Sequence, residues 1–423
     1  MRISIVGAGY VGLISSICFA ELGHSVKLVE LDNEKIQLIN LGITPFYEKG
    51  SDDLLSKHIG HNLIATSTYE GISDSDVIFI CVGTPAAPDG SADLSMVESA
   101  ARSIGNVLRK SKRYHVVVVK STVPPGTTQN LVIPCVLETN RKGLHDIGFA
   151  MNPEFLREGR AIRDFMDPDR IIIGSADNRA GDLIESVYTE VNAPIIKTEI
   201  SSAEMIKYAS NAFLATKISF SNEIGNLCKC LGIDAYDVMK GVGLDHRISP
   251  YFLNAGAGFG GSCIPKDVSA LIHLAQDIGE DPVLLKSVMK INEQQPLRMI
   301  KLLEKRVGQL QGKKVAVIGL AFKNDTDDIR ESRAILVIKE LLRKGAEVSA
   351  YDPIANETMR QINPEVQYCL SPAEALFNAD GCLVMTEWPQ FKALDKEFNL
   401  MKTRVIIEGR RILRCKDAEG LCW

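Results

Sequence analysis

The chain contains short runs of apolar, β-branched residues that end at a glycine, one at positions 2–6 and another at 314–318. After each run, apolar positions recur with helical spacing, and a second apolar run then closes on an acidic residue. Strands that alternate with helices in this way predict parallel sheets built from βαβ units. The pattern predicts strands at 2–6, 26–30, 77–82, 114–119, 148–151, 171–174, 314–318, 348–352, 381–386 and 405–408. We therefore expect two α/β domains, near 1–195 and 312–423.

The segment 201–232 lies between these domains, contains no proline and favours a single helix. Its apolar residues follow helical spacing, at Ile206, Ala209, Phe213, Ile218, Phe220, Ile224 and Leu227. At about 1.5 Å per residue such a helix exceeds roughly 40 Å in length. It is long enough to bridge two domains and to support a dimer interface, and we assign 196–300 to a central helical region.

Composition narrows the classes of function. Lys plus Arg number 48 against 53 for Asp plus Glu, and the net charge of −5 argues against a general nucleic-acid or anionic-membrane surface. Ten cysteines without metal-ligand spacing predict thiols in a reducing cytoplasm and no metal site. The uncharged run 3–20 has the length of a marginal membrane span, but glycines and serines interrupt it. We expect a cytoplasmic protein that does not enter the membrane.

The first glycine-rich turn has the form of a dinucleotide-binding site. Residues 7–12 read GAGYVG, directly after the strand 2–6 and at the start of a helix that Gly23 ends. The glycines of such a turn allow close approach of a pyrophosphate, which the helix N-terminus attracts. Glu30 closes the next strand and would accept hydrogen bonds from the adenine ribose, which favours NAD over NADP. Asp32 is an alternative for that role, but the phase of the strand favours Glu30.

One cysteine stands apart from the other nine. Cys263 lies in the segment GFGGSCIPKD at 258–267, and apolar spacing after it predicts a helix in which Pro265 occupies the first turn. A thiol at a helix N-terminus, next to Lys266, meets the conditions that lower a thiol pKa and produce a nucleophile. Asp267 follows at i+4 on the same helical face.

For two further segments, the sequence permits either a catalytic role or an ordinary solvent-exposed position. Glu154 and Glu158 lie four residues apart in NPEFLREG at 152–159, after an expected strand end, and supply either a general base or a solvated helix cap. Lys207 and Asn211 lie at i and i+4 on the long helix, where they either stabilise an oxyanion or face solvent.

Taken together, these motifs are similar to those of the nucleotide-sugar 6-dehydrogenases. The resemblance extends over essentially the whole chain and rests on GAGYVG (7–12), FICVGTP (79–85), DGSADLS (89–95), KSTVPPGTT (120–128), NPEFLREG (152–159), GFGGSCIPKD (258–267) and GLAFKNDTDDIRES (319–332). It implies two Rossmann-like domains, for NAD and for a UDP-sugar, joined by a long central helix that forms a homodimer. It also implies oxidation of a primary alcohol at sugar C6 to a carboxylate, with two NAD⁺ and one catalytic cysteine.

The resemblance implies a role for each matching residue. Cys263 would be the nucleophile, Lys207 and Asn211 would stabilise oxyanions, and Asp267 would assist proton transfer or orient the lysine. Glu154 would serve the hydrolytic water, with Thr122 nearby. The implied cofactor-binding residues are Gly7, Gly9, Tyr10, Val11, Gly12, Glu30, Lys35, Thr84, Thr122, Glu158, Lys266 and Arg330. The implied substrate-binding residues are Glu154, Phe155, Leu156, Arg157, Glu158, Lys207, Asn211, Arg247, Tyr251, Phe252, Asn254, Phe259, Gly260, Phe322 and Lys323.

The expected substrate is UDP-glucose, oxidised to UDP-glucuronate, and GDP-mannose is the alternative within the same mechanism. Ser262 and Lys266 speak against the branch of the family that acts on N-acetylhexosamines. A one-step β-hydroxyacid dehydrogenase would need neither the thiol nor the last 110 or so residues of the chain, and a non-catalytic NAD sensor would not need the full set of catalytic positions. The sequence departs from the family pattern in two places: Glu30 replaces an Asp, and EGRR at 408–411 replaces DGRN.

Overall fold

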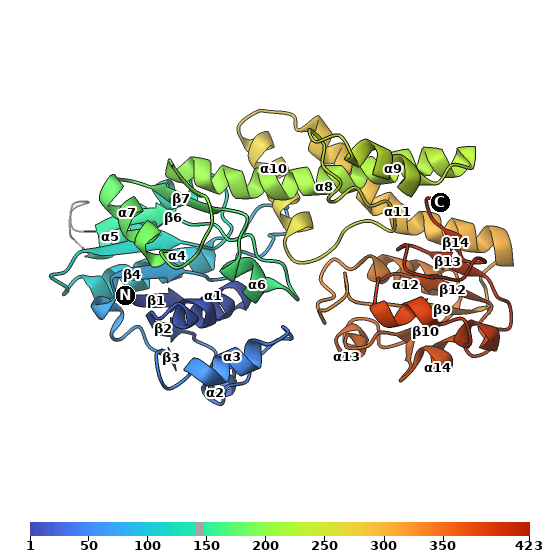
Figure 1. Ribbon diagram of the computed structural model, residues 1–423, viewed down its shortest axis with the longest axis horizontal. Helices are drawn as coiled ribbons and strands as arrows, with labels where there is room; N and C mark the ends of the chain where they lie inside the picture. Colours follow the sequence, from blue (N-terminus) through green and yellow to red (C-terminus); the bar gives the residue numbers. More distant parts are fainter. Residues whose placement is uncertain (141–146) are drawn as a thin grey trace. The chain divides into compact units, whose positions relative to one another are not determined.

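The computed structural model describes residues 1–140 and 147–423, which form two compact units, Met1–Ser210 and Asn211–Trp423 (Figure 1). The predicted α/β class, with two mostly parallel sheets and a long helix, is confirmed. Among the described residues, no helix has both the length and the apolar character needed to cross a membrane.

Unit 1 is built on an eight-stranded sheet with the order β3-β2-β1-β4-β5-β6-β7-β8. Neighbouring strands are parallel except β6 and β7. The strands are β1 (Arg2–Val6), β2 (Ser25–Val29), β3 (Leu63–Thr66), β4 (Val77–Ile80), β5 (His115–Val119), β6 (Ile147–Met151), β7 (Ile171–Ser175) and β8 (Ile195–Thr198). The direction of winding reverses between β1 and β4, and doubly wound sheets bind ligands in the crevice at that point.

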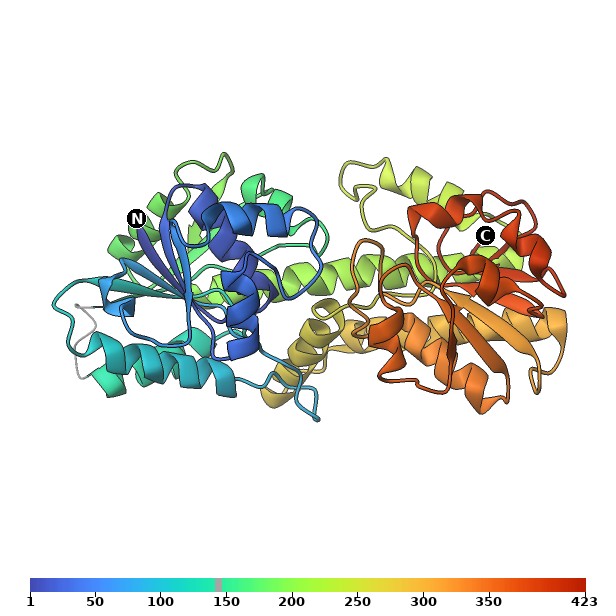
Figure 2. The same ribbon diagram turned by 90° about the horizontal axis from the view of Figure 1, so that it is seen from below.

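Helices cover both faces of this sheet because its strands are apolar on both sides. One face, with Ile3 and Ile5 of β1, packs against α1 (Tyr10–Glu21), α3 (Ser51–His58), α6 (Ala161–Met166) and α7 (Asn178–Val187). The other, with Val117 and Val119 of β5, packs against α4 (Ser95–Leu108), α5 (Ile133–Asn140) and the first turn of α8 (Ile200–Leu231). Figure 2 shows the teal α4 and α5 and the dark-blue α1 on opposite sides of the sheet. The smaller elements are α2 (Asn33–Asn40), η1 (Ile72–Asp74) and η2 (Thr128–Val132).

Unit 2 repeats the arrangement in a six-stranded parallel sheet with the order β11-β10-β9-β12-β13-β14. Its strands are β9 (Lys314–Ile318), β10 (Glu347–Tyr351), β11 (Gln367–Tyr368), β12 (Gly381–Val384), β13 (Ile406–Glu408) and β14 (Glu419–Gly420). Alternate residues of β9 face opposite layers, Val315 and Val317 toward one core and Ala316 and Ile318 toward the other. The winding of this sheet reverses between β9 and β12.

The helices of unit 2 are the remainder of α8, α9 (Ala235–Gly243), α10 (Ile264–Asp277), α11 (Val283–Val307), α12 (Arg333–Arg343), α13 (Asn356–Arg360), α14 (Pro372–Leu376), η3 (Pro389–Ala393) and η4 (Glu397–Leu400). The long helix expected at 201–232 is α8, displaced by one residue at each end. Each predicted strand is present with small changes at its ends. The pattern missed β3, β8, β11 and β14, which lie away from the centres of the sheets and have two to four residues.

Glu408 closes β13 and is buried, and both Ile412 N and Leu413 N donate hydrogen bonds to its Oε1. Burial is the main cause that raises its pKa from 4.5 to about 7. The folded chain therefore binds the proton of the Glu408 carboxyl more tightly than the unfolded chain does. The stability that this protonation contributes is complete below about pH 4.5 and is lost as the pH rises toward 7.

We expect Glu408→Gln, which keeps Oε1 as acceptor, to unfold at higher denaturant concentration than the wild type at pH 8. The gain in free energy of unfolding should be on the order of 1–3 kcal/mol and should shrink as the pH approaches 5. Urea unfolding of both proteins at pH 5, 6, 7 and 8 measures it. A difference that does not change with pH would contradict the assignment.

Candidate active site

The glycine-rich loop after β1 has the geometry of a pyrophosphate cradle. Gly7 has φ +100°, and a Cβ there would lie 2.9 Å from the carbonyl oxygen of Cys81. A Cβ on Gly12 would lie 1.9 Å from Gly7 O, so helix and strand approach too closely for a side chain. A Cβ on Gly9, by contrast, would meet nothing within 4 Å. The glycine that begins α1 therefore leaves open space beside helix N–H groups, as a bound dinucleotide requires.

Side chains at the strand ends border this loop. The carboxylate of Glu30 accepts hydrogen bonds from Ala8 N at 2.8 Å and from Leu31 N at 2.8 Å, so it ties the end of β2 to the glycine-rich turn. The Thr84 hydroxyl donates to the Thr122 carbonyl at 2.8 Å, which joins the loops after β4 and β5. These residues follow the carboxyl ends of β1, β2, β4 and β5, which are neighbours in the sheet.

Glu48 belongs to this region and escaped the sequence analysis. It is buried and accepts hydrogen bonds from the Tyr10 hydroxyl, from Gly159 N at 2.5 Å and from Ala161 N at 2.9 Å. It thereby ties the first residue of α1 to the loop that carries Glu158. Burial, followed by the bond to Glu48, raises the pKa of Tyr10. Glu48 lies in an irregular loop without periodicity, and its partners are distant in sequence, so no local pattern marks it.

Glu204 is a second residue that the sequence analysis missed. It is fully buried on α8 and accepts from Gly126 N at 2.6 Å and Thr128 N at 2.8 Å. Burial raises its pKa, while these N–H groups oppose the rise. It fixes the segment after β5 that contains Thr122. Its position three residues before Lys207, on a neighbouring part of the helix surface, was the only available signal.

The NPEFLREG segment supplies a buried ion pair in unit 1. Glu154 Oε1 lies 2.8 Å from Lys207 Nζ, and the side chains are only 6% and 5% exposed. The other carboxylate oxygen accepts from Leu156 N at 2.6 Å. Buried Lys120, whose pKa burial lowers to about 8, donates to Asn152 Oδ1 at 3.0 Å and holds the start of the segment. The surface alternative for Glu154 and Lys207 is therefore wrong.

Arg157, by contrast, forms an ion pair with Asp164, and its side chain is 53% exposed.

The thiol of Cys263 lies at the start of α10 in unit 2, with Pro265 in the first turn as predicted. Asp267 is buried and accepts from Asn211 Nδ2 at 2.6 Å and from Lys266 Nζ at 2.6 Å. The carboxylate is held from two sides, one of them α8. Asn211 is itself buried, so its alternative as a surface residue is also wrong. Within the described residues, all ten cysteines are thiols rather than disulfides.

The loop before Cys263 runs alongside residues expected to bind substrate. Phe259 is buried, and a Cβ on Gly261 would lie 2.8 Å from the ring of Phe322. Gly261 N donates to Arg330 O at 2.9 Å, so this part of the predicted set lies together.

Other residues of the predicted set point to solvent. The exposed side chain of Arg247 pairs with Asp245, and Tyr251 and Asn254 are exposed. Lys35 is half-buried on α2, and its ammonium lies 3.9 Å from the Asp32 carboxylate. The Arg330 side chain pairs with Asp328.

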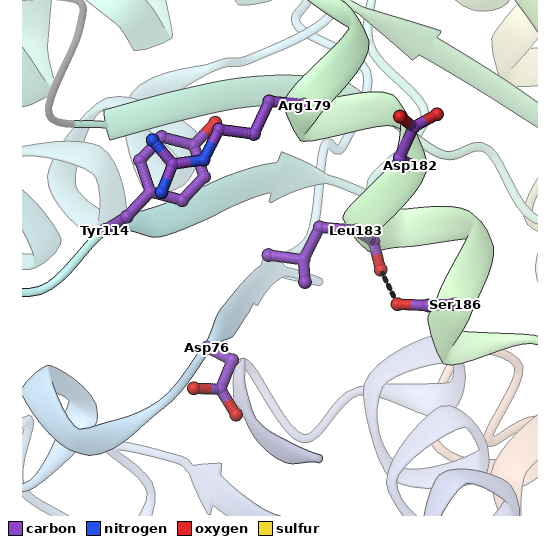
Figure 3. A pocket seen from close by; sticks show the side chains of 6 residues that line it. All are labelled: Asp76, Tyr114, Arg179, Asp182, Leu183 and Ser186. Atoms are coloured by element: carbon purple, nitrogen blue, oxygen red, sulfur yellow. Dashed lines mark hydrogen bonds between the residues drawn. The ribbon is translucent and has the colours of Figure 1, made fainter.

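A pocket of about 630 Å³ in unit 1 lies away from these groups. Its lining consists of Asp76, Tyr114, Arg179, Asp182, Leu183 and Ser186. Figure 3 shows the Arg179 guanidinium over the ring of Tyr114. Arg179 Cζ lies 3.5 Å from the ring centroid. Asp76 and Tyr114 directly precede β4 and β5, so the pocket is at the amino ends of the strands, whereas the glycine-rich loop follows a carboxyl end. It is not the dinucleotide site.

A glycine-rich turn of this geometry at the switch point of a doubly wound sheet is typical of dehydrogenases that use a dinucleotide. The NAD binding domain of the UDP-glucose/GDP-mannose dehydrogenase family matches residues 1–192, its central domain matches 201–294, and its UDP binding domain matches 316–415. The chain belongs to this family of NAD-dependent enzymes, and NAD is its cofactor.

Individual relatives cover nearly all of the chain. UDP-glucose 6-dehydrogenase AglM of Haloferax volcanii is 47% identical over 423 residues, 99% of this chain and 98% of that protein. The structure of a UDP-glucose dehydrogenase from Pyrobaculum islandicum has a TM-score of 0.95 and 43% identity, with coverage of 100% and 98%. A GDP-mannose dehydrogenase structure from Pseudomonas aeruginosa has a TM-score of 0.58 and 36% identity, with both chains fully covered.

Two glycines of the cradle, Gly9 and Gly12, should differ when replaced by alanine. Gly12→Ala places a Cβ against the backbone of Gly7 and should destabilise unit 1 by roughly 2–4 kcal/mol. Gly9→Ala should change stability by no more than about 1 kcal/mol but weaken NAD⁺ binding by about tenfold or more, because its Cβ enters the space left for the pyrophosphate. Thermal unfolding and calorimetric titration with NAD⁺ separate the two effects. Wild-type NAD⁺ affinity in Gly9→Ala would show that the cofactor does not bind at this loop.

Proposed function

We propose that the protein oxidises UDP-glucose to UDP-glucuronate and releases two NADH for each sugar. The observation that carries the proposal is the Cys263 thiol at the start of α10, one helical turn before a buried Asp267 that Asn211 and Lys266 hold in place. A dehydrogenase that stops at the aldehyde does not need such a thiol.

The chemistry explains why a nucleophile belongs here. In the first oxidation the C6 hydroxyl loses its proton and C6 loses a hydride, which gives an aldehyde. Bound NAD⁺ supplies the hydride acceptor for both oxidations, one molecule for each. The aldehyde carbon releases a second hydride only after something adds to it. Addition of the Cys263 thiolate forms a C–S bond and turns the carbonyl into the alkoxide of a thiohemiacetal.

Loss of the second hydride restores the C=O bond as a thioester, and attack of water then breaks the C–S bond to release carboxylate and thiol. Lys207 and Asn211 are assigned to the C6 oxygen, which gains negative charge in each step, because both carry N–H donors. Asp267 assists proton transfer or orients the lysine. Glu154, with Thr122 nearby, positions the hydrolytic water.

UDP-glucose is preferred over GDP-mannose because relatives at 40–47% identity carry the UDP-glucose name, whereas the GDP-mannose enzyme reaches 36%. In this proposal 1–195 binds NAD and 312–423 binds the UDP-sugar. Glu158 is assigned to both ligands, and Phe259, Phe322 and Lys323 are assigned to the UDP-sugar. The ten thiols suit a reducing cytoplasm.

The proposal includes a homodimer formed through α8, which lies in the 196–300 region and carries an exposed apolar stripe. Phe213, Phe220 and Leu227 follow at intervals of seven residues and are 64%, 46% and 58% exposed. A seven-residue repeat places them on one side of the helix, and a stripe of this kind favours contact with a second helix.

The stoichiometry of NADH tests the reaction. We expect two NADH and one UDP-glucuronate per UDP-glucose, followed by absorbance and product mass. Cys263→Ser should lose at least about 99% of the two-step turnover, because an alcohol is a far weaker nucleophile than a thiolate. The matched control is Cys230→Ser, which removes an exposed thiol from α8 and should behave as the wild type.

Each part of the proposal has its own contrary outcome. One NADH per sugar in the wild type would refute the four-electron reaction. Full oxidation by Cys263→Ser would remove this thiol from the mechanism, and turnover of GDP-mannose alone would refute the assigned substrate.

The dimer is tested by placing charge on the stripe. The double variant Phe213→Glu, Phe220→Glu should sediment as a monomer at concentrations where the wild type is a dimer, because four carboxylates would be buried in the interface. Leu370→Glu, at an exposed site 91% accessible on another surface, is the control and should remain a dimer. Unchanged mass of the double variant in light scattering would place the interface elsewhere.

A further inference from the structure

The loop 255–261 has almost no regular structure, yet unit 2 holds its backbone at successive residues. Gly256 N donates to Asn222 Oδ1 at 2.7 Å, and Ala257 N donates to Gly409 O at 2.9 Å. Arg410 donates to Gly258 O at 2.6 Å. These partners come from α8 and from the segment after β13. The loop is therefore fitted to its surroundings residue by residue.

Asn292 of α11 makes the most complete of these contacts. Its Oδ1 accepts from Phe259 N at 2.7 Å, and its Nδ2 donates to Phe259 O at 3.0 Å. The side chain is fully buried, with an exposed fraction of 0%. One amide thus satisfies both backbone groups of a single residue, as a neighbouring β-strand would.

The fit around this amide is tight. Gly258 has φ +100°, and a Cβ there would lie 2.6 Å from Asn292 Oδ1. Two residues further along the loop, a Cβ on Gly260 would lie 2.3 Å from Glu331 O. The backbone passes between α11 and the segment after β9 with no room for a shift in register.

From this arrangement we infer that Asn292 is a positioning residue for the thiol, acting through Phe259 and the three residues that separate it from Cys263. The inference rests on the proposed role of Cys263. Only a neutral amide offers one donor and one acceptor at the spacing of a peptide group. Replacement by leucine leaves both buried groups of Phe259 without partners, and ionised aspartate sets an oxygen against the Phe259 carbonyl. Either change frees the loop and moves the thiol from the helix N-terminus that stabilises its thiolate.

The test measures the reactivity of the Cys263 thiol as well as the rate of turnover. In Asn292→Leu and Asn292→Asp, we expect iodoacetamide to alkylate Cys263 at pH 7 at least about fivefold more slowly, as measured by mass spectrometry of its peptide. The kcat for UDP-glucuronate formation should fall about tenfold or more, while KM for NAD⁺ changes less than about twofold. A general loss of folded structure would not lower kcat while leaving KM for NAD⁺ nearly unchanged.

Ser219→Ala is the matched control, because Ser219 is buried on α8 and donates to Val288 O of α11 at 2.9 Å without touching the loop. It should leave alkylation and kcat unchanged. Wild-type alkylation rates in both Asn292 variants would overturn the inference. If neither variant folds, hydrogen exchange of the wild-type Phe259 amide decides, since exchange as fast as in exposed loops would also overturn it. Failure of the proposed function would appear separately, as full oxidation by Cys263→Ser.

Discussion

The chemistry of this protein depends on loops whose backbones are held by buried polar side chains. Glu48 holds the turn before α6, Glu204 the segment after β5, and Asn292 the approach to Cys263. A buried N–H or C=O without a partner costs about 1–3 kcal/mol, so each of these contacts selects one loop conformation over many. The two sheets supply stable ends for the loops, and the buried carboxylates and amides determine what lies between them.

The local part of this organisation was accessible from the sequence. Strand and helix periods, the glycines of 7–12 and the cysteine before Pro265 are signals carried by residues close together in the chain. The pairing of Glu154 with Lys207 joins residues 53 apart, and the bond from Gly159 to Glu48 spans 111. Such pairs follow from how the strands are ordered in the sheet, which spacing alone does not specify. For the same reason the sequence suggested Lys207 and Asn211 but left the surface alternative open for both.

An acidic residue follows the second strand of each sheet and makes the same backbone contact, but the two carboxylates differ in burial. Glu30 and Asp352 each follow the second strand of their sheet and accept backbone hydrogen bonds from the glycine turn, from Ala8 N at 2.8 Å and from Leu320 N at 2.7 Å. Asp352 is buried and also binds Trp388 Nε1 at 3.0 Å, whereas Glu30 remains partly accessible. The Asp352 carboxylate thus makes only buried structural contacts. Of the two, the Glu30 carboxylate is the one that remains accessible to a ribose.

The uninterrupted α8 sets a limit on how this chain can diverge. Glu204 and Lys207 meet partners in unit 1, and Asn211 and Asn222 meet partners in unit 2. Each residue added to a helix rotates everything beyond it by about 100°. Within unit 2, a single residue inserted between 211 and 222 would leave the helix intact and yet rotate Asn222 relative to Asn211, so that the two amides could no longer meet Gly256 N and Asp267 together. Homologues should therefore tolerate many substitutions along this segment while keeping its length constant.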